Sequence, residues 1–247
     1  MDFLTAVKTG NIARVRELLP TEDMSVEDHD GNTPFIHAVA KGHLEIIKLF
    51  IRNSTSEDIY AMLRHKNKSG MNAFTLASAL DKVEILKELL PHKGFLSMEV
   101  NDRIPGEGRG QTALMLASKN IMGETNGVET VRLLLDNGAN INMRSDNGFT
   151  ALMHAVINNQ LDIVRLLLDR GAKVNLGADK PRNEYNSNSN SNSNNEPKPV
   201  PRVRALSLAT TPAMRDLLLS YDARLSKSAV SRRRRSNRRS LRTRRAH

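Results

Sequence analysis

The phrase GFTALMHAVI begins at Gly148, and three close variants of it occur earlier in the chain. They read GNTPFIHAVA from Gly31, GMNAFTLASA from Gly70 and GQTALMLASK from Gly110. An alanine follows each glycine by seven residues, which gives spacings of 39, 40 and 38 residues between Ala38, Ala77, Ala117 and Ala155. Recurrence at this distance, with the same residue types in the same places, predicts a row of stacked structural units.

Each phrase reads as a turn followed by a short helix. Glycine tolerates the positive φ that a tight turn requires. The residue two places after the glycine can accept hydrogen bonds from the first turn of a helix, and the chain has Thr33, Asn72, Thr112 and Thr150 at this place. Pro34 suits the start of a helix, and the small alanines allow neighbouring helices to approach closely.

A second helix is predicted in every unit. The segments are HLEIIKLFI from His43, KVEILKELL from Lys82, VETVRLLLD from Val128 and LDIVRLLLD from Leu161. Apolar residues recur three and four positions apart, so one face of each helix is apolar and the other is charged. Glycines 138 and 171 follow two of these helices, where glycine suits a helix C-terminus.

This pattern resembles the ankyrin repeat over most of residues 2–175. The family consensus runs D-G-x-T-P-L-H-x-A, then G-H-x-E-V-V-x-L-L-L, then G-A-D-V-N. The positions that fit it include Asp30, Gly31, Thr33, Pro34, Ala38, Gly42, His43, Glu45 and Leu49 in one unit, and Gly148, Thr150, Leu152, Ala155, Leu166, Leu167, Gly171, Ala172 and Asn175 in another. The resemblance implies an all-α solenoid of stacked helix-turn-helix units with short β-hairpin loops.

The chain departs from the family pattern in two ways. The consensus histidine is replaced by Ile36, Thr75, Met115 and Met153, and the consensus proline is present only at Pro34. The units are also longer than the usual ~33 residues. We place the additional residues in loops at Asn53–Lys66, Pro91–Arg109 and Ile121–Gly127.

The chain divides into five predicted segments. A degenerate N-terminal cap repeat (1–26) precedes the repeat array (27–180), whose units are 30–66, 69–104, 109–142 and 147–176. Residues 181–201 form a linker rich in asparagine, serine and proline, including NSNSNSNSNN, which buries too little apolar surface to fold. A degenerate C-terminal repeat or cap follows (202–226), with a stray amphipathic helix as the alternative. Residues 227–247 form a disordered tail rich in arginine.

The net charge of +10 belongs almost entirely to the C-terminus. Residues 224–247 hold eleven Lys and Arg and no acid, so residues 1–223 carry 10 − 11 = −1. The sequence has no cysteine, no secretory signal pattern at its start and no apolar run of bilayer length. We therefore expect an intracellular protein, in the nucleus or the cytoplasm, without a membrane span.

The basic tail predicts one of three partners. An import receptor would recognise the clustered arginines as a nuclear localisation signal, nucleic acid would bind them through its phosphates, and an anionic membrane would attract them. The fourth possibility is a solvated tail with no dedicated partner. No aromatic residue interleaves the arginines, so any nucleic-acid contact is expected to be non-specific. The arginines concerned are Arg232, Arg233, Arg234, Arg235, Arg238, Arg239, Arg242, Arg244 and Arg245, with Ser236 and Ser240 as candidate phosphorylation sites.

Patterns typical of catalysis or cofactor binding are missing from the sequence. The glycine-rich run at residues 106–110 lacks the Lys-Ser/Thr pair of a phosphate-binding loop. The seven histidines have no metal-ligand spacing supported by carboxylates, and no serine, histidine and acid group stands out. We expect no enzymatic activity, no cofactor, no metal and no small-molecule substrate.

The resemblance implies that partner proteins bind at the hairpin tips and on the concave face. The corresponding residues are His29, Asp30, Lys41, Lys68, Arg109, Lys119, Ser145, Asp146, Asn147 and Asn158. The preferred function is a non-catalytic protein-interaction scaffold with a nuclear localisation tail. Two alternatives stay open: a nucleic-acid-associated regulator whose tail binds RNA or DNA while the repeats recruit a protein, and a host-targeted effector of an intracellular microbe or virus.

Overall fold

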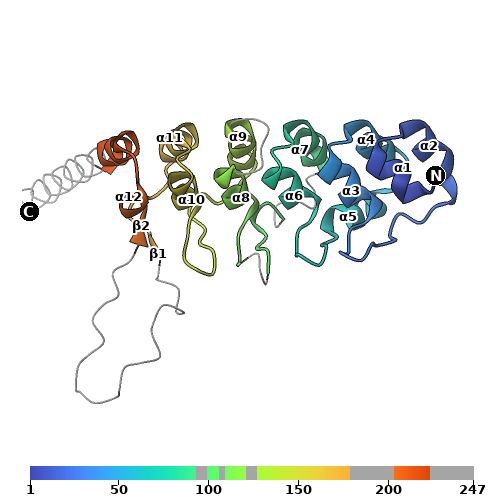
Figure 1. The fold of residues 1–247 in the computed structure, drawn as a ribbon, viewed down its shortest axis with the longest axis horizontal. Coiled ribbons are helices and arrows are strands. Elements are labelled where there is room, and N and C mark those ends of the chain that lie inside the picture. Colours follow the sequence, from blue (N-terminus) through green and yellow to red (C-terminus); the bar gives the residue numbers. More distant parts are fainter. Residues whose placement is uncertain (93–98, 106–108, 121–126, 179–202, 223–247) are drawn as a thin grey trace, which may run out of the picture.

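The chain forms an elongated row of helix pairs, shown in Figure 1. The computed structural model describes residues 1–92, 99–105, 109–120, 127–178 and 203–222. The inner helices are α1 (Phe3–Thr9), α3 (Pro34–Lys41), α6 (Ala73–Ala79), α8 (Ala113–Lys119), α10 (Ala151–Ile157) and α12 (Ala205–Leu208). The outer helices are α2 (Ile12–Leu18), α4 (Leu44–Arg52), α7 (Val83–Leu89), α9 (Val128–Asp136) and α11 (Leu161–Asp169), and residues 212–222 are also helical. The predicted all-α stack is confirmed.

The inner helices begin where the sequence predicts. The side chains of Thr33, Asn72, Thr112 and Thr150 each accept a hydrogen bond from the backbone N–H three residues later. Each such cap stabilises its helix by about 1 kcal/mol because it satisfies a donor that the helix cannot. Asn72 also receives a reciprocal contact, since its backbone N–H donates to Thr75 Oγ1 at 2.9 Å.

The turn between inner and outer helix has a left-handed residue in all four central units. Gly42 occupies this position in the first, with φ 80°, and Asp81, Asn120 and Asn159 occupy it in the next three, with φ between 43° and 55°. Asparagine and aspartate tolerate this conformation better than other non-glycine residues. Asp81 is buried and accepts a hydrogen bond from Thr130 of α9, so this turn also ties neighbouring units together.

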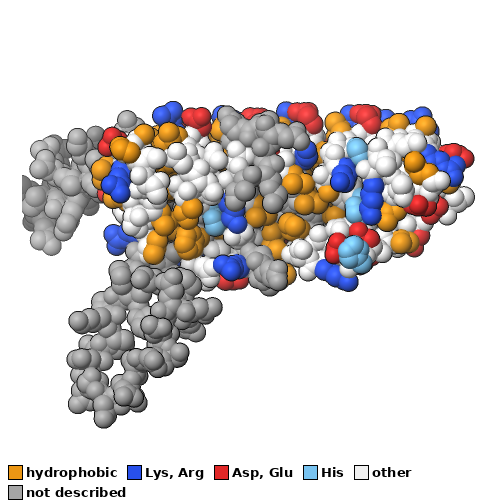
Figure 2. All heavy atoms as spheres, in the orientation of Figure 1, with side chains coloured by type: hydrophobic (Ala, Val, Ile, Leu, Met, Phe, Trp, Pro, Cys, Tyr) orange, Lys and Arg blue, Asp and Glu red, His pale blue; other side chains and the backbone are white. Residues whose placement is uncertain are grey.

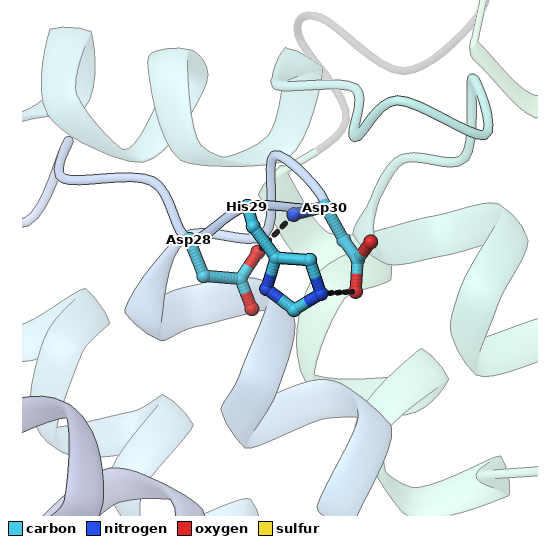
Figure 3. A group of neighbouring side chains, drawn as sticks. All are labelled: Asp28, His29 and Asp30. Atoms are coloured by element: carbon cyan, nitrogen blue, oxygen red, sulfur yellow. Dashed lines mark hydrogen bonds and ion pairs between the residues drawn. The ribbon is translucent and has the colours of Figure 1, made fainter.

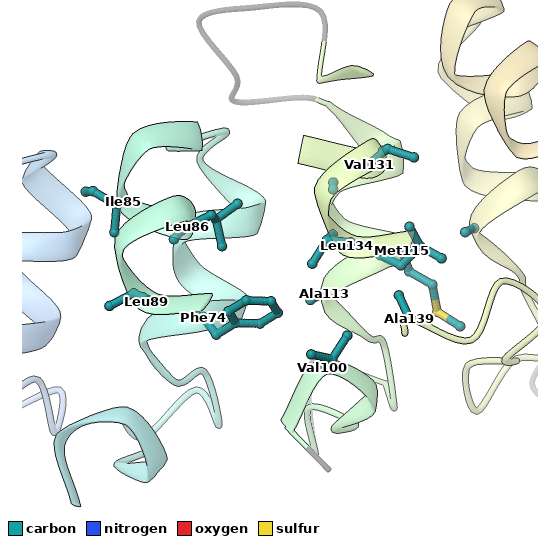
Figure 4. Packing of buried hydrophobic residues seen from close by; sticks show 14 of the residues in the cluster. Phe74, Ile85, Leu86, Leu89, Val100, Ala113, Met115, Val131, Leu134 and Ala139 are labelled. Atoms are coloured by element: carbon teal, nitrogen blue, oxygen red, sulfur yellow. The ribbon is translucent and has the colours of Figure 1, made fainter. Parts of the chain in front are cut away.

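The core lies between consecutive inner helices and beneath the outer ones. Ala38, Ala77, Ala117 and Ala155 are at most 3% exposed, which permits the close contacts of α3 with α6, α6 with α8, and α8 with α10. Figure 4 shows Phe74 pointing from α6 towards Ala113 of α8, with Val100 of the segment Glu99–Asn101 below Ala113. Each unit therefore completes its core only against its neighbours, as expected of a solenoid.

The loops before the inner helices, here called finger loops, are residues 28–32, 67–71, 104–111 and 145–149. Asp28 N donates to Asn32 O at 3.0 Å in the first, and Ser145 N donates to Phe149 O at 2.9 Å in the fourth. Within the described part of these loops, a β-bridge occurs only between Ile104 and Gln111. In the three loops of five residues the predicted β-hairpins are turns, because so short a reversal leaves no room for a ladder.

The segment 53–66 contains a helix that the sequence analysis did not predict. Helix α5 (Ser56–Arg64) begins with a reciprocal pair, in which Asp58 N donates to Thr55 Oγ1 and Thr55 N donates to Asp58. Its Met62 and Leu63 are buried in the core, and the helix contacts α6. The prediction of a loop was wrong here, because the Thr-x-x-Asp cap and the apolar pair Met62-Leu63 were overlooked. Three short 3₁₀ helices complete the helical segments: η1 (Leu19–Thr21), η2 (Leu90–His92) and η3 (Glu99–Asn101).

Both ends of the row are closed by shorter units. At the N-terminus, α1 packs on α3 and α2 on α4, with Phe3, Val7 and Val15 buried. At the other end, strand β1 (Gly177–Ala178) pairs antiparallel with β2 (Val203–Arg204), and α12 contacts α10. Met214 and Leu218 of the last helix are fully buried. The predicted linker (181–201) and the tail (227–247) lie outside the described residues.

Candidate protein-interaction surface

Single backbone hydrogen bonds join the first finger loop to the second and the third to the fourth, and Gly70 of the second loop packs against Pro105 of the third. Lys68 N donates to Asp30 O at 2.9 Å, and Asp146 N donates to Arg109 O at 2.9 Å. His65 Nε2, at the end of α5, also lies 2.7 Å from Gly31 O, which ties α5 to the first loop. The loops therefore present their tips as one surface rather than as independent projections.

Most of the predicted tip residues are exposed in this line. His29, Asp30, Lys68, Arg109 and Asp146 are all exposed, and Asn147 is half-buried. Ser145 differs, because it is buried and its Oγ accepts a hydrogen bond from Phe149 N at 3.1 Å. Ser145 thus closes the turn from inside, and its prediction as an exposed contact residue was wrong.

The three predicted positions on the inner helices also differ in accessibility. Lys41 is exposed at the end of α3. Lys119 is half-buried and donates to Gln111 Oε1 at 2.8 Å, while Asn158 is half-buried and donates to His154 O at 2.9 Å. Lys119 and Asn158 therefore hold the ends of their own helices, and their polar atoms are only partly available to a partner.

The outward side of the inner helices carries apolar residues that the sequence analysis did not single out. Positions four, seven and eight after each N-cap share one helix face, because they are separated by three or four residues. In the middle of the row this face carries Leu76, Leu80, Leu116 and Ile157, here called the apolar strip. Ile157 is 45% exposed and the three leucines are half-buried. Repetition of leucine at the fourth position of α6 and α8 was the signal available in the sequence.

His154 occupies the same fourth position in α10, but its imidazole is buried. Nε2 has no hydrogen-bond partner among the described residues, and the ring centroid lies 5.7 Å from that of Phe149. Burial, assisted by the charge of Lys119, lowers the pKa of His154 to about 4. Burial also lowers the pKa of Lys119 itself, with a further contribution from Arg109. His154 is therefore neutral at physiological pH.

The first finger loop contains a group of three potential metal ligands, Asp28, His29 and Asp30, shown in Figure 3. The Asp28 carboxylate already accepts hydrogen bonds from the backbone N–H groups of Asp30 and Asn32, and lies 2.8 Å from His37 Nε2. Burial raises the pKa of Asp28, but these donors outweigh it and the net shift is downward. His29 and Asp30 are exposed, so the arrangement is a hydrogen-bonded turn around Asp28.

His37 completes this turn from the inner helix. Burial lowers its pKa even though the Asp28 carboxylate favours the charged form. The neutral imidazole therefore donates its Nε2–H to Asp28, and the pair fixes the loop to α3. His37 lies one position after Ile36, which occupies the place of the consensus histidine, and the sequence analysis did not single it out.

The outer helices carry charge pairs along the exposed edge, and Figure 2 shows Lys, Arg and acidic side chains following the upper edge of the molecule. The pairs are three residues apart and include Lys48–Glu45, Lys87–Glu84 and Arg132–Glu129. In the same view, apolar side chains gather lower down, over the inner helices. Exposed ion pairs contribute little to stability, so this edge is mainly a solvated surface.

Two sequence predictions remain, one on the basic tail and one on the absence of a membrane span. The arginines between 232 and 245, and the candidate phosphorylation sites Ser236 and Ser240, lie outside the described residues. Among the helices that the structure describes, none is both long enough and apolar enough to cross a bilayer.

Comparison with family models places the chain among known proteins. A model described as "Ankyrin repeats (3 copies)" matches residues 3–104 and again residues 95–178, which together span more than half of the 247 residues. The family is in general non-catalytic, and its arrays bind other proteins. The row of helix pairs with aligned finger loops is a scaffold for protein–protein interaction, and the chain belongs to the ankyrin-repeat family.

Proposed function

We propose that the apolar strip and the neighbouring finger tips hold an apolar segment of a partner protein. The observation that carries this proposal is the exposure of Ile157 on the outward side of α10, in line with Leu116 and Leu76 on α8 and α6. Complete burial of one such side chain is worth about 1.5–3 kcal/mol. Charged finger tips along one side of the strip, such as Lys68 and Asp146, would set the orientation of the bound segment.

The test compares variants of the full chain in affinity capture. Leu116→Asp and Ile157→Asp place a charge on the strip, and each is expected to weaken capture of the partner by tenfold or more, since 1.4 kcal/mol corresponds to a factor of ten. Leu219→Asp is the matched control, because Leu219 is 49% exposed on the last helix, away from the strip. Equal capture by all three variants would refute the proposal. Circular dichroism establishes that each variant is folded.

We further propose that the arginine tail acts as a nuclear localisation signal. Its support is compositional, since residues 224–247 hold eleven basic residues and no acid. Clustered basic side chains suit the acidic groove of an import receptor. A reporter fused to residues 227–247 should enter the nucleus, and the reporter with alanine at Arg232–Arg235 should not.

The same tail would serve a nucleic-acid-associated regulator if it bound phosphates. Titration of the full chain on RNA at several salt concentrations separates the two roles, because phosphate contacts lose affinity steeply with salt. Nuclear entry without salt-sensitive RNA binding supports import. Aspartate at both Ser236 and Ser240 adds negative charge to the tail and should reduce nuclear accumulation; unchanged accumulation would count against a phosphorylation switch.

A further inference from the structure

The unpredicted helix α5 helps to form a pocket of about 880 Å³ near the N-terminal end of the row. Its other walls are the segment 19–27, which follows α2, and the C-terminal part of α4. The apolar part of the lining includes Met62 of α5, Leu49 of α4 and Met24. Leu49 and Met24 are half-buried against the core, so the pocket has an apolar floor of fixed position.

The rim of this pocket is acidic. Glu22, Asp23, Glu27 and Asp58 line it, all four exposed, against the single arginine Arg16. Counting Asp, Glu, Lys and Arg, the lining therefore carries a net charge of −3. Two of the acids also accept local hydrogen bonds through their carboxylates, Asp23 from the Ser25 hydroxyl and backbone N–H, and Asp58 from the Thr55 hydroxyl and backbone N–H. These bonds lower the pKa of both carboxyls, so Asp23 and Asp58 stay ionised at neutral pH.

We propose that this pocket binds the basic tail of the same chain, with Leu241 on the apolar floor and the adjacent arginines on the acidic rim. The tail has the required chemistry, because Leu241 lies between Arg239 and Arg242 in a segment without acids. A rim of charge −3 attracts such a segment more strongly than it attracts any stretch of the nearly neutral repeat array. Docking there would occupy the same arginines that an import receptor or a nucleic acid would bind.

The tail is long enough to reach the pocket along the row. From Asp222, where the described residues end, to Leu241 the chain has 19 residues, which span at most about 63–68 Å when extended. Four to five steps between neighbouring helices, at about 8–10 Å each, separate the last unit from the pocket, a distance of roughly 30–50 Å. The tail therefore reaches the pocket within one molecule.

A single fluorophore on the full chain tests this contact. The natural sequence has no cysteine, so Ala246→Cys provides a unique labelling site. Time-resolved anisotropy of the label reports whether the tail tumbles with the folded array. Docking predicts a slowly rotating fraction at 50 mM salt that is lost at 500 mM, where the screening length falls from about 14 Å to about 4 Å.

Two pairs of variants identify the binding site. Glu22→Lys with Glu27→Lys changes the lining from −3 to +1 and should remove the slow fraction. Glu84→Lys with Glu129→Lys makes the same change of charge on the outer helices and should leave it intact.

Leu241→Ser tests the apolar contact of the tail with the pocket floor. Leu225→Ser is the control, because it makes the same change in a part of the chain that precedes the proposed contact. Leu241→Ser should reduce the slow fraction severalfold, whereas Leu225→Ser should not. Release by both charge pairs, or by neither, would overturn the proposal. So would a slow fraction that grows with protein concentration, since the tail would then bind a second molecule. The measurement uses no import receptor, so docking and import can each fail independently.

Discussion

Replacement of His154 by leucine should remove a pH-dependent loss of stability. Burial holds the pKa of this imidazole at about 4, against an ordinary value of 6.5. As the pH falls below 6.5, His154 therefore becomes protonated in the unfolded chain but stays neutral in the folded chain. Stability decreases through the window from 6.5 to 4 and becomes level below it. Leucine suits the site because Leu76 and Leu116 occupy the same repeat position in α6 and α8.

The magnitude follows from the two pKa values. At pH 5, protonation of the unfolded state lowers the free energy of unfolding by about 2 kcal/mol relative to pH 7, and a folded-state pKa one unit higher would still leave about 1.6 kcal/mol. The side chain is only 9% exposed, so solvent screening reduces this value little. The difference in unfolding free energy between His154→Leu and the wild type should therefore grow by about 2 kcal/mol from pH 7 to pH 5.

Urea unfolding followed by circular dichroism measures this difference. The unfolding free energy of a protein of this size falls by about 2–3 kcal/mol per molar urea. The urea midpoints of His154→Leu and the wild type should therefore differ by ~0.7–1 M more at pH 5 than at pH 7. The comparison cancels the titration of His37 and of the carboxylates, which both proteins share. A difference that stays constant between pH 7 and pH 5 would show that burial does not keep His154 neutral.

Three other predictions concern packing and backbone conformation. Phe74→Ala should lower the unfolding free energy by about 3–5 kcal/mol in urea titration, because the ring is 1% exposed and points into the α6–α8 interface; a loss under 1 kcal/mol would contradict this packing. Gly171→Ala should lower the unfolding free energy only by the strain of a positive φ, about 1–2 kcal/mol, since no atom lies within 4 Å of the added carbon. Gly70→Ala should lower it more, because the added carbon would lie 2.6 Å from Pro105 Cδ. Equal losses in thermal unfolding would contradict that distinction. Met214→Ala should speed hydrogen exchange in residues 203–222 but not in α3, because each unit contacts only its neighbours.

Features determined within a few residues could be predicted from the sequence. The N-caps at Thr33 and Asn72 depend on one side chain and a backbone N–H three positions away, so the repeated phrase was sufficient to find them. The alanines at the helix contacts follow from the same periodicity. The left-handed turns at Asp81 and Asn159 were less apparent, because the family glycine is absent there and only the tolerance of these side chains for positive φ replaces it.

Features that depend on contacts between units could not be predicted in the same way. Exposure of a tip residue depends on the turn beneath it, so Ser145 was placed at the surface although its hydroxyl bonds inward to Phe149 N. The neutral state of His154 depends on burial beside Phe149, which no local pattern indicates. The N-terminal pocket requires α5 and the segment 19–27 together, and these are separated by an entire helix pair.

The positions of the long insertions follow from how the units hold one another. Ala178 pairs with Val203, so the two ends of the 24-residue insertion between them are held side by side. An insertion with fixed ends costs mainly loop-closure entropy, which rises by only about 0.6 kcal/mol for each doubling of length. Among the described residues, the last unit is held by the contact of α12 with α10 and by the hydrogen bond from Asn175 to Asp222. Helix α5 is an insertion of a different kind, which folds because it supplies its own N-cap and its own buried side chains. It thereby forms one side of the N-terminal pocket on the surface of the array. The stack therefore tolerates added sequence between its units, and the surface formed by that sequence is where this chain differs most from a regular repeat.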